Sequence, residues 1–151
     1  MSQSCNNNIQ AIFSYGTLRA DRTIDGDDWG VMSQLKSKGW DCIWYYGTLS
    51  GYSLYQDKSL FYPFATPNSS GIVKGTVLTW ASKDAFDIAL PHCDSIEGYT
   101  EDNSGLYKRT VVDVYTKERG IIKAYFYYQE MPVDYSPHRY LAFPDGDWVK
   151  K

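Results

Sequence analysis

Hydrophobic positions form short stretches separated by glycine and polar clusters, a pattern typical of strands joined by turns. Residues 11–15 predict a short apolar strand that stops at Gly16. Residues 43–55 are aromatic and punctuated by glycine, and we expect a second strand there.

The next segment predicts two extended pieces with a turn between them. Residues 60–65 form a short extended piece broken by Pro63, and the polar cluster 67–71 closes it as a turn. Residues 72–80 alternate in the manner of a strand.

A helix is expected after Ser82, which is a suitable N-cap. Pro91 interrupts this helix or starts a short second one, and Gly98 suits the position that follows a helix end. One face of the predicted helix is apolar, with Ala85, Phe86, Ala89 and Leu90 at helical spacing.

The rest of the chain predicts a hairpin and an irregular tail. Residues 107–115 and 121–128 read as strands joined by a turn at 118–120, and we expect the segment from Pro132 to be irregular. Its aromatic and apolar side chains would dock on the body of the protein, namely Tyr140, Leu141 and Phe143.

The order of elements favours an α+β fold or a small barrel with helices on its flank, in one domain over residues 1–151. Residues 1–9 predict a polar, frayed tail. The segment 19–41 is rich in Asp and Gly, with one short helix expected at 31–38.

Composition narrows the class of protein. The chain has 151 residues, of which 43% are hydrophobic and 22% charged, as in a globular protein that buries roughly 70% of its surface. A net charge of -3 argues against nucleic-acid binding. No apolar run reaches the length of a membrane span, and the first ten residues lack the features of a signal peptide.

The metal-ligating and redox residues are few. Three widely spaced cysteines match neither a zinc pattern nor a disulfide framework, and two histidines do not suggest a metal site. We therefore expect no metal and no cofactor, and a cytoplasmic location. Cys93 is expected to be a small buried hydrophobe rather than a nucleophile.

Aromatic residues make up 17% of the chain, and 14 of them are tyrosine. They fit a β-rich core, and a few tyrosine hydroxyls could orient a polar ligand in a cleft. The turn after the first strand is a second candidate feature, because backbone N–H groups around Gly16 can bind a carboxylate or an oxyanion.

Several short motifs, in order along the chain, resemble those of the gamma-glutamylcyclotransferase-like superfamily. The resemblance covers residues 11–148, although Cys93 stands where leucine is usual and the segment 20–42 is longer and more acidic than expected. The similar segments are Ile-Phe-Ser-Tyr-Gly-Thr-Leu-Arg at 12–19, Gly-Thr-Leu-Ser-Gly-Tyr-Ser-Leu-Tyr at 47–55, Tyr-Pro-Phe-Ala at 62–65, Val-Lys-Gly-Thr-Val at 73–77, Cys-Asp-Ser-Ile-Glu-Gly-Tyr at 93–99, Leu-Tyr-Lys-Arg at 106–109, Ala-Tyr-Phe-Tyr at 124–127 and Gly-Asp-Trp at 146–148.

The resemblance implies a small mixed β-barrel with one or two short helices beside it, and an enzyme that releases an amine or amino compound from a gamma-glutamyl substrate as 5-oxoproline forms. It implies Glu97 as general acid/base. The residues expected to bind substrate are Tyr15, Gly16, Thr17 and Leu18, with Tyr127 as a further ligand-facing hydroxyl.

The chemistry is consistent with a site that has no triad and no metal. The substrate's own α-amine attacks its γ-carbonyl, so the protein needs a base, a proton donor for the leaving nitrogen, and N–H donors for the developing oxyanion. Arg19 is a further candidate for pairing with an anionic substrate.

Two other functions remain open at this level. One is a non-catalytic module on the same fold that binds a small ligand or a protein. The other is a single-strand nucleic-acid binder built on aromatic stacking, against which the acidic residues at 21–28 argue. The leaving amine and the oligomeric state are not specified by the sequence.

Overall fold

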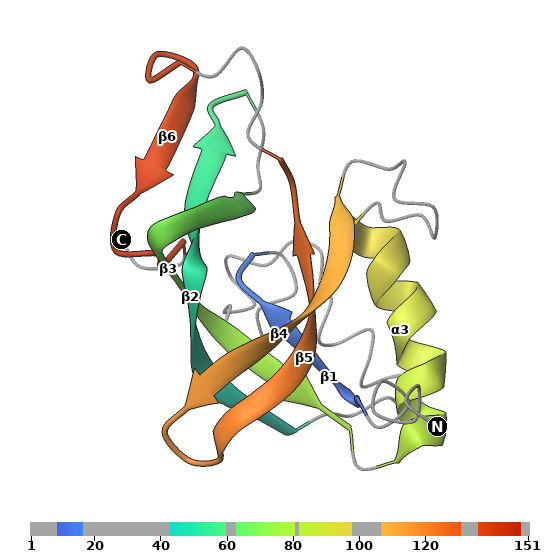
Figure 1. Ribbon diagram of the computed structural model, residues 1–151. Coiled ribbons are helices and arrows are strands. Elements are labelled where there is room, and N and C mark those ends of the chain that lie inside the picture. The colour runs from blue at the N-terminus through green and yellow to red at the C-terminus, as the bar shows by residue number, and fades with distance from the viewer. Residues whose placement is uncertain are drawn as a thin grey trace, which may run out of the picture.

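The computed structural model describes residues 9–16, 43–59, 63–80, 82–97, 107–130 and 136–148. Within these ranges it contains six strands and one helix (Figure 1). In chain order they are β1 (Ala11–Ser14), β2 (Ile43–Asp57), β3 (Phe64–Thr79), α3 (Lys83–Glu97), β4 (Lys108–Thr116), β5 (Gly120–Tyr128) and β6 (Tyr140–Phe143).

Five of the strands close into a barrel. The order along the sheet is β3-β1-β5-β4-β2-β6, and a further pairing of β2 with β3 completes the ring. The neighbours are antiparallel except β1 and β5, which pair in parallel through Ile12 with Tyr125 and Phe13 with Phe126. The structure therefore confirms the expected small mixed barrel with a flanking helix.

Alternation along the strands produces two hydrophobic clusters on opposite sides of the sheet. Phe13 and Phe126 belong to the cluster inside the barrel, whereas their neighbours Ile12 and Tyr127 belong to the cluster outside it. The inner cluster is Ala11, Phe13, Tyr15, Leu49, Leu54, Ala65, Val73, Val77, Val114, Ala124 and Phe126. The outer cluster is Ile12, Phe64, Leu78, Trp80, Phe86, Ala89, Tyr107, Tyr127 and Tyr140.

Helix α3 packs against the outer cluster through Phe86 and Ala89, which are buried (Figure 1). The Ser82 hydroxyl accepts a hydrogen bond from the Ala85 N–H at 3.1 Å, so the predicted N-cap is confirmed. The expectation that Pro91 interrupts the helix is wrong, because α3 continues through it. Because proline has no N–H, the carbonyl four residues before Pro91 lacks its helical donor. Pro91 lies on the exposed face of α3, so water can solvate that carbonyl.

The turn expected at 67–71 is also wrong, because β3 continues through this cluster. The register with β2 shifts between Ser50 and Tyr52, so the polar residues form an irregularity within a long strand. Asn68 supports it by accepting a hydrogen bond from the Ser70 N–H at 3.1 Å. Gly71 is required there, since a Cβ would lie 2.2 Å from the Tyr52 carbonyl oxygen.

The predicted hairpin is confirmed as β4 and β5, with Gly120 in the left-handed region at a φ of 68°. The C-terminal segment is more regular than expected, because β6 pairs with the end of β2.

An ion pair joins Asp57, the last residue of β2, to Arg139, the residue before β6. Asp57 accepts hydrogen bonds from the Ser59 N–H at 3.0 Å and hydroxyl at 2.8 Å, and from Arg139 Nη2 at 3.0 Å. The Ser59 hydrogen bonds, with a smaller contribution from Arg139, hold the pKa of the Asp57 carboxyl below its usual value.

Some expectations lie outside the described residues. These are the frayed tail as far as residue 8, the short helix at 31–38, the burial of Cys93, and Gly98 as the end of α3. The expectation of a frayed tail over 1–9 is wrong at Ile9, which is 5% exposed and belongs to the core. Within the part that is described, no helix is long and apolar enough to cross a membrane.

Candidate active site

Tyr15 follows β1 directly and lies in the inner cluster, where its ring centroid is 5.4 Å from that of Phe126. Its hydroxyl donates to the Tyr127 carbonyl oxygen at 2.6 Å and accepts from the Ala65 N–H at 3.1 Å. One phenolic hydroxyl thus joins the ends of β1 and β5 to the start of β3. The first residue of the predicted substrate loop is therefore fixed on three strands.

Gly16 is buried and lies against Pro63, the residue before β3. A Cβ at this position would be 3.0 Å from the Pro63 Cδ atom, so the chain passes close to the proline ring. Tyr107 also binds Pro63, since its hydroxyl donates to the Pro63 carbonyl oxygen at 2.5 Å. The close packing of these residues accounts for a glycine at the end of the first strand.

Two buried hydroxyls next to this network have no hydrogen-bond partner within the described part of the chain. They belong to Ser14, which precedes Tyr15, and to Thr66, which follows Ala65. An unpaired buried hydroxyl costs about 1–3 kcal/mol, so native proteins usually give such a group a partner.

Tyr127 lies at the end of β5 with its ring buried in the outer cluster. Its hydroxyl donates to Oδ1 of Asp94 on α3 at 2.5 Å. Tyr127 is therefore bound at both ends: its carbonyl accepts from Tyr15 and its hydroxyl donates to the helix. It connects the predicted substrate loop with the C-terminal part of α3.

Asp94 also binds Arg109 on β4, with Oδ2 at 2.6 Å from Nη1. Both side chains are largely buried, at 18% and 19% exposed. The Arg109 guanidinium lies 4.8 Å from the ring centroid of Tyr125, which stacks on Phe86 with ring centroids 5.9 Å apart. This carboxylate therefore ties the last turns of α3 to β4 and β5.

Glu97 is the last residue of α3, less than one helical turn beyond Asp94. Its side chain lies outside what the structure describes, as do Thr17, Leu18 and Arg19. The structure thus brings together Tyr15, Gly16, Tyr127 and the helix that carries Glu97. The roles assigned to these residues stay predictions.

Tyr52 lies inside the barrel at the same end, edge-on to Phe126 with ring centroids 4.8 Å apart. Burial raises the pKa of its hydroxyl, and Tyr128 and Glu130 raise it further. The phenol therefore keeps its proton at neutral pH and can act as a donor. Among the described residues no group of three or more His, Cys, Asp or Glu could hold a metal ion.

Three residues of this site, Asp94, Arg109 and Tyr52, were given no role by the sequence alone. Asp94 and Arg109 both lie within segments that resemble family motifs, and Tyr52 lies in another. A signal for Asp94 was its spacing of three from Glu97 on a predicted helix, which places both positions near one helix end. Nothing in the sequence pairs Asp94 with Arg109, because that contact depends on how α3 docks.

A closed mixed barrel with a helix tied to one end defines the fold class of the chain. The family model described as gamma-glutamyl cyclotransferase, AIG2-like, matches residues 12–150. The chain therefore belongs to the AIG2-like gamma-glutamyl cyclotransferase family. No curated protein shows significant similarity to it.

Solved structures share this fold. At3g28950.1 from Arabidopsis thaliana is 25% identical, with a TM-score of 0.55, over 92% of this chain and 68% of that one. An AIG2-like protein from Mus musculus is 18% identical, with a TM-score of 0.57, over 87% of this chain and 82% of that one. YkqA from Bacillus subtilis is 20% identical, with a TM-score of 0.56, over 92% of this chain but 39% of its own.

Proposed function

We propose that this protein is a cyclotransferase that releases an amine or amino compound from a gamma-glutamyl substrate and forms 5-oxoproline. Family membership supports a gamma-glutamyl cyclotransferase-like function in general. The observation that carries the specific proposal is the double attachment of Tyr127. Its contacts with Tyr15 and Asp94 keep the start of the predicted loop and the last turns of α3 at one end of the barrel.

In the proposed reaction, Glu97 takes a proton from the substrate's α-ammonium group. The freed amine attacks the γ-carbonyl carbon, and the bond from that carbon to the leaving nitrogen breaks. Glu97 then returns the proton to the leaving nitrogen. The ring nitrogen still carries one proton too many after the attack, and this second proton also passes to the departing amine, through Glu97 or solvent. The products are the 5-oxoproline lactam and an ammonium group, so that atoms and charge balance. A single carboxylate suffices for both transfers, which typically contribute about 10²–10⁴-fold.

The protein's other task is to hold the substrate in the cyclising conformation. Nucleophile and electrophile belong to one molecule, and good alignment of such groups gives effective molarities of about 10⁵–10⁸ M. We assign the binding of the glutamyl group to Tyr15, Gly16, Thr17 and Leu18, whose backbone N–H groups would face the developing oxyanion. Tyr127 is assigned to the same site, and its contact with Asp94 makes orientation of the site its main task.

We also propose that the substrate is a small molecule and that the protein acts in the cytoplasm. The three cysteines and the absence of a disulfide pattern in the sequence support a reducing compartment.

The test is a screen of gamma-glutamyl amines and gamma-glutamyl peptides for release of 5-oxoproline by the purified chain. On the best substrate, Glu97→Gln should lower kcat by 100-fold or more, because it keeps the shape of the side chain but removes the base. Glu118→Gln is the matched control, since Glu118 lies on the β4–β5 turn at the other end of the barrel.

Full turnover by Glu97→Gln on a confirmed substrate would show that the assigned mechanism is wrong. Saturable binding of gamma-glutamyl compounds without release of 5-oxoproline would favour the non-catalytic binding module instead.

A further inference from the structure

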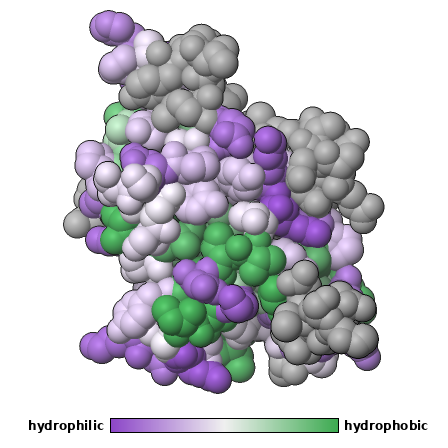
Figure 2. Space-filling model, viewed as in Figure 1, coloured by the Kyte–Doolittle hydropathy of each residue, from purple (hydrophilic) through white to green (hydrophobic). Residues whose placement is uncertain are grey.

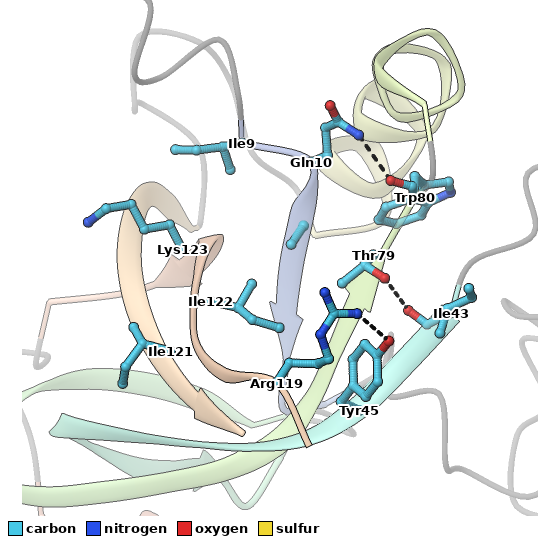
Figure 3. A pocket seen from close by; sticks show the side chains of 11 residues that line it. Ile9, Gln10, Ile43, Tyr45, Thr79, Trp80, Arg119, Ile121, Ile122 and Lys123 are labelled. Carbon is cyan, nitrogen blue, oxygen red and sulfur yellow. Dashed lines mark hydrogen bonds between the residues drawn. The ribbon is translucent and has the colours of Figure 1, made fainter. Parts of the chain in front are cut away.

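The barrel is hollowed at the end opposite the candidate active site (Figure 3). Its volume is about 540 Å³, within the range of about 300–1,000 Å³ that is typical of small-molecule sites. We call it the barrel mouth. Its lining residues are Ile9, Gln10, Ala11, Ile43, Tyr45, Thr79, Trp80, Arg119, Ile121, Ile122 and Lys123.

The position of the barrel mouth follows from strand direction. The mouth is lined by Gln10 and Ala11 at the start of β1, whereas Tyr15 and Gly16 follow its end. β5 runs parallel to β1, so its first residues line the mouth and Tyr127 near its end belongs to the candidate active site. The two sites therefore share strands but not residues.

The mouth exists because the barrel is incompletely paired at this end. The parallel ladder between β1 and β5 covers Ile12 with Tyr125 and Phe13 with Phe126 only. Residues 9–11 and 121–123 precede the paired positions of β1 and β5, and they line the space between the two strands. Thr79 closes the opposite side by pairing with Ala11 and with Ile43.

The side chains that line the barrel mouth are largely apolar, and two of these side chains are unusually exposed. Ile43 and Ile121 are each 62% exposed, the highest values among the large hydrophobic side chains of the described ranges. Figure 2 shows hydrophobic side chains gathered over the β4–β5 hairpin, with polar groups around them. A ligand with an apolar body would bury these side chains and gain about 25 cal/mol per Å² covered.

The positive charge of Arg119 at the rim of the mouth favours a ligand whose polar end is negatively charged. Arg119 Nη1 lies 3.1 Å from the Tyr45 hydroxyl, and its guanidinium is 5.7 Å from that ring's centroid (Figure 3). The ion pairs within the described part of the chain do not include Arg119, whereas Lys123 pairs with Asp113 at 2.8 Å. Among the described residues that line the mouth, none carries a carboxylate. The guanidinium of Arg119, next to the Tyr45 hydroxyl, is a suitable partner for a ligand carboxylate.

We propose that the barrel mouth binds a small amphipathic carboxylate. Its apolar body lies against Ile43, Ala11 and Ile122, and its carboxylate binds the Arg119 guanidinium beside the Tyr45 hydroxyl. A small molecule fits this hollow better than a protein segment does, because the hollow is compact and is bounded by four strands and the β4–β5 turn. Binding here is independent of turnover at the opposite end.

Titration of the ¹⁵N-labelled full chain with octanoate, followed by amide chemical shifts, tests the proposal. We expect saturable shifts at Ala11, Thr79 and Ile122 with a dissociation constant on the order of 1 mM, as suits a ligand of this size. Octanamide, which has the same chain without the charge, should bind at least tenfold more weakly. Equal binding of both probes, or shifts that map elsewhere, would overturn the proposal.

Two substitutions with matched controls locate the binding groups. Arg119→Gln should weaken octanoate at least tenfold, whereas Lys117→Gln, which removes one charge from the same turn, should change it less than twofold. Ile43→Ser should also weaken it, unlike Ile88→Ser on α3, where the isoleucine is 54% exposed. Both isoleucines are exposed, so these variants keep the fold. Equal effects within either pair contradict the assignment. Because the readout is binding, these outcomes are separate from those of the turnover experiments.

Discussion

The side chain of Tyr15 lies inside the barrel and that of Tyr127 outside it, yet a hydrogen bond of 2.6 Å joins the Tyr15 hydroxyl to the Tyr127 carbonyl. The bond couples a side chain inside the barrel to the backbone of a residue whose own side chain lies outside it. Tyr15, which begins the predicted substrate loop, and Asp94 near the end of α3 cannot shift independently, because each is attached to Tyr127 of β5.

Removal of the Tyr15 hydroxyl should therefore destabilise the fold. Tyr15→Phe leaves the buried Ala65 N–H and Tyr127 carbonyl without this partner, and we expect the free energy of unfolding to fall by about 2–3 kcal/mol. Denaturant unfolding followed by fluorescence measures the change. Tyr46→Phe is the control, since Tyr46 is 57% exposed and should change stability by less than about 0.5 kcal/mol. Similar values for both variants would show that the internal hydrogen bonds of Tyr15 carry no special weight.

The Asp94 carboxylate is the second attachment that we expect to matter. Asp94→Asn keeps an oxygen for the Tyr127 hydroxyl but removes the charge opposite Arg109, and should lower the free energy of unfolding by about 1–3 kcal/mol. In Asp113→Asn the lost pair with Lys123 is mostly exposed, so a change under about 0.5 kcal/mol is expected. Thermal unfolding of both variants gives the comparison. A loss no larger in Asp94→Asn would mean that the helix end is held by its apolar contacts alone.

Two glycines should respond differently to alanine. At Gly75 a Cβ would lie 2.2 Å from the Ser14 carbonyl oxygen, so β1 and β3 would have to separate, at a cost of about 3 kcal/mol. Gly51 has open space around it but a φ of 98°, so alanine there costs about 1–2 kcal/mol from backbone strain alone. Chemical denaturation of the two variants ranks these costs. The reverse order would contradict the close approach of β1 to Gly75.

Acid should weaken the attachment of β6. The folded pKa of Asp57 is below its ordinary value of 3.8, so its contribution to stability is present in full above about pH 4. That contribution is lost as the pH falls through the folded pKa, where the carboxyl takes up a proton. The stability difference between the native chain and Asp57→Asn should therefore shrink below pH 4, as urea unfolding at several pH values would measure. A difference that stays constant down to pH 2 would rule out this linkage.

The sequence predicted most of the fold because its elements carry local signals. Ser82 marks the start of α3, and the turn at 118–120 marks the hairpin. The errors at Pro91 and at 67–71 have a shared cause, since local signals for breaking an element were outweighed by packing. Helix α3 is held through Phe86 and Ala89, and β3 is held along its length by β2.

The candidate site was predictable only as a set of motifs. The apolar residues of the first strand predict where it ends, at Tyr15 and Gly16. Glu97 was predicted only from the resemblance to the family. The contacts of Tyr127 with both Tyr15 and Asp94 depend on strand register and on helix docking, which no local pattern specifies. The barrel mouth was missed for the same reason, because Arg119 and Ile43 are distant in sequence.

The parallel ladder between β1 and β5 has a consequence for how the molecule assembles. It joins strands separated by on the order of a hundred residues, so loop closure makes it a late event in folding. A nascent chain that has reached only α3 offers β1 a single neighbour, β3. The barrel mouth, which the start of β5 helps to line, therefore forms only after the β4–β5 hairpin has left the ribosome and docked against β1.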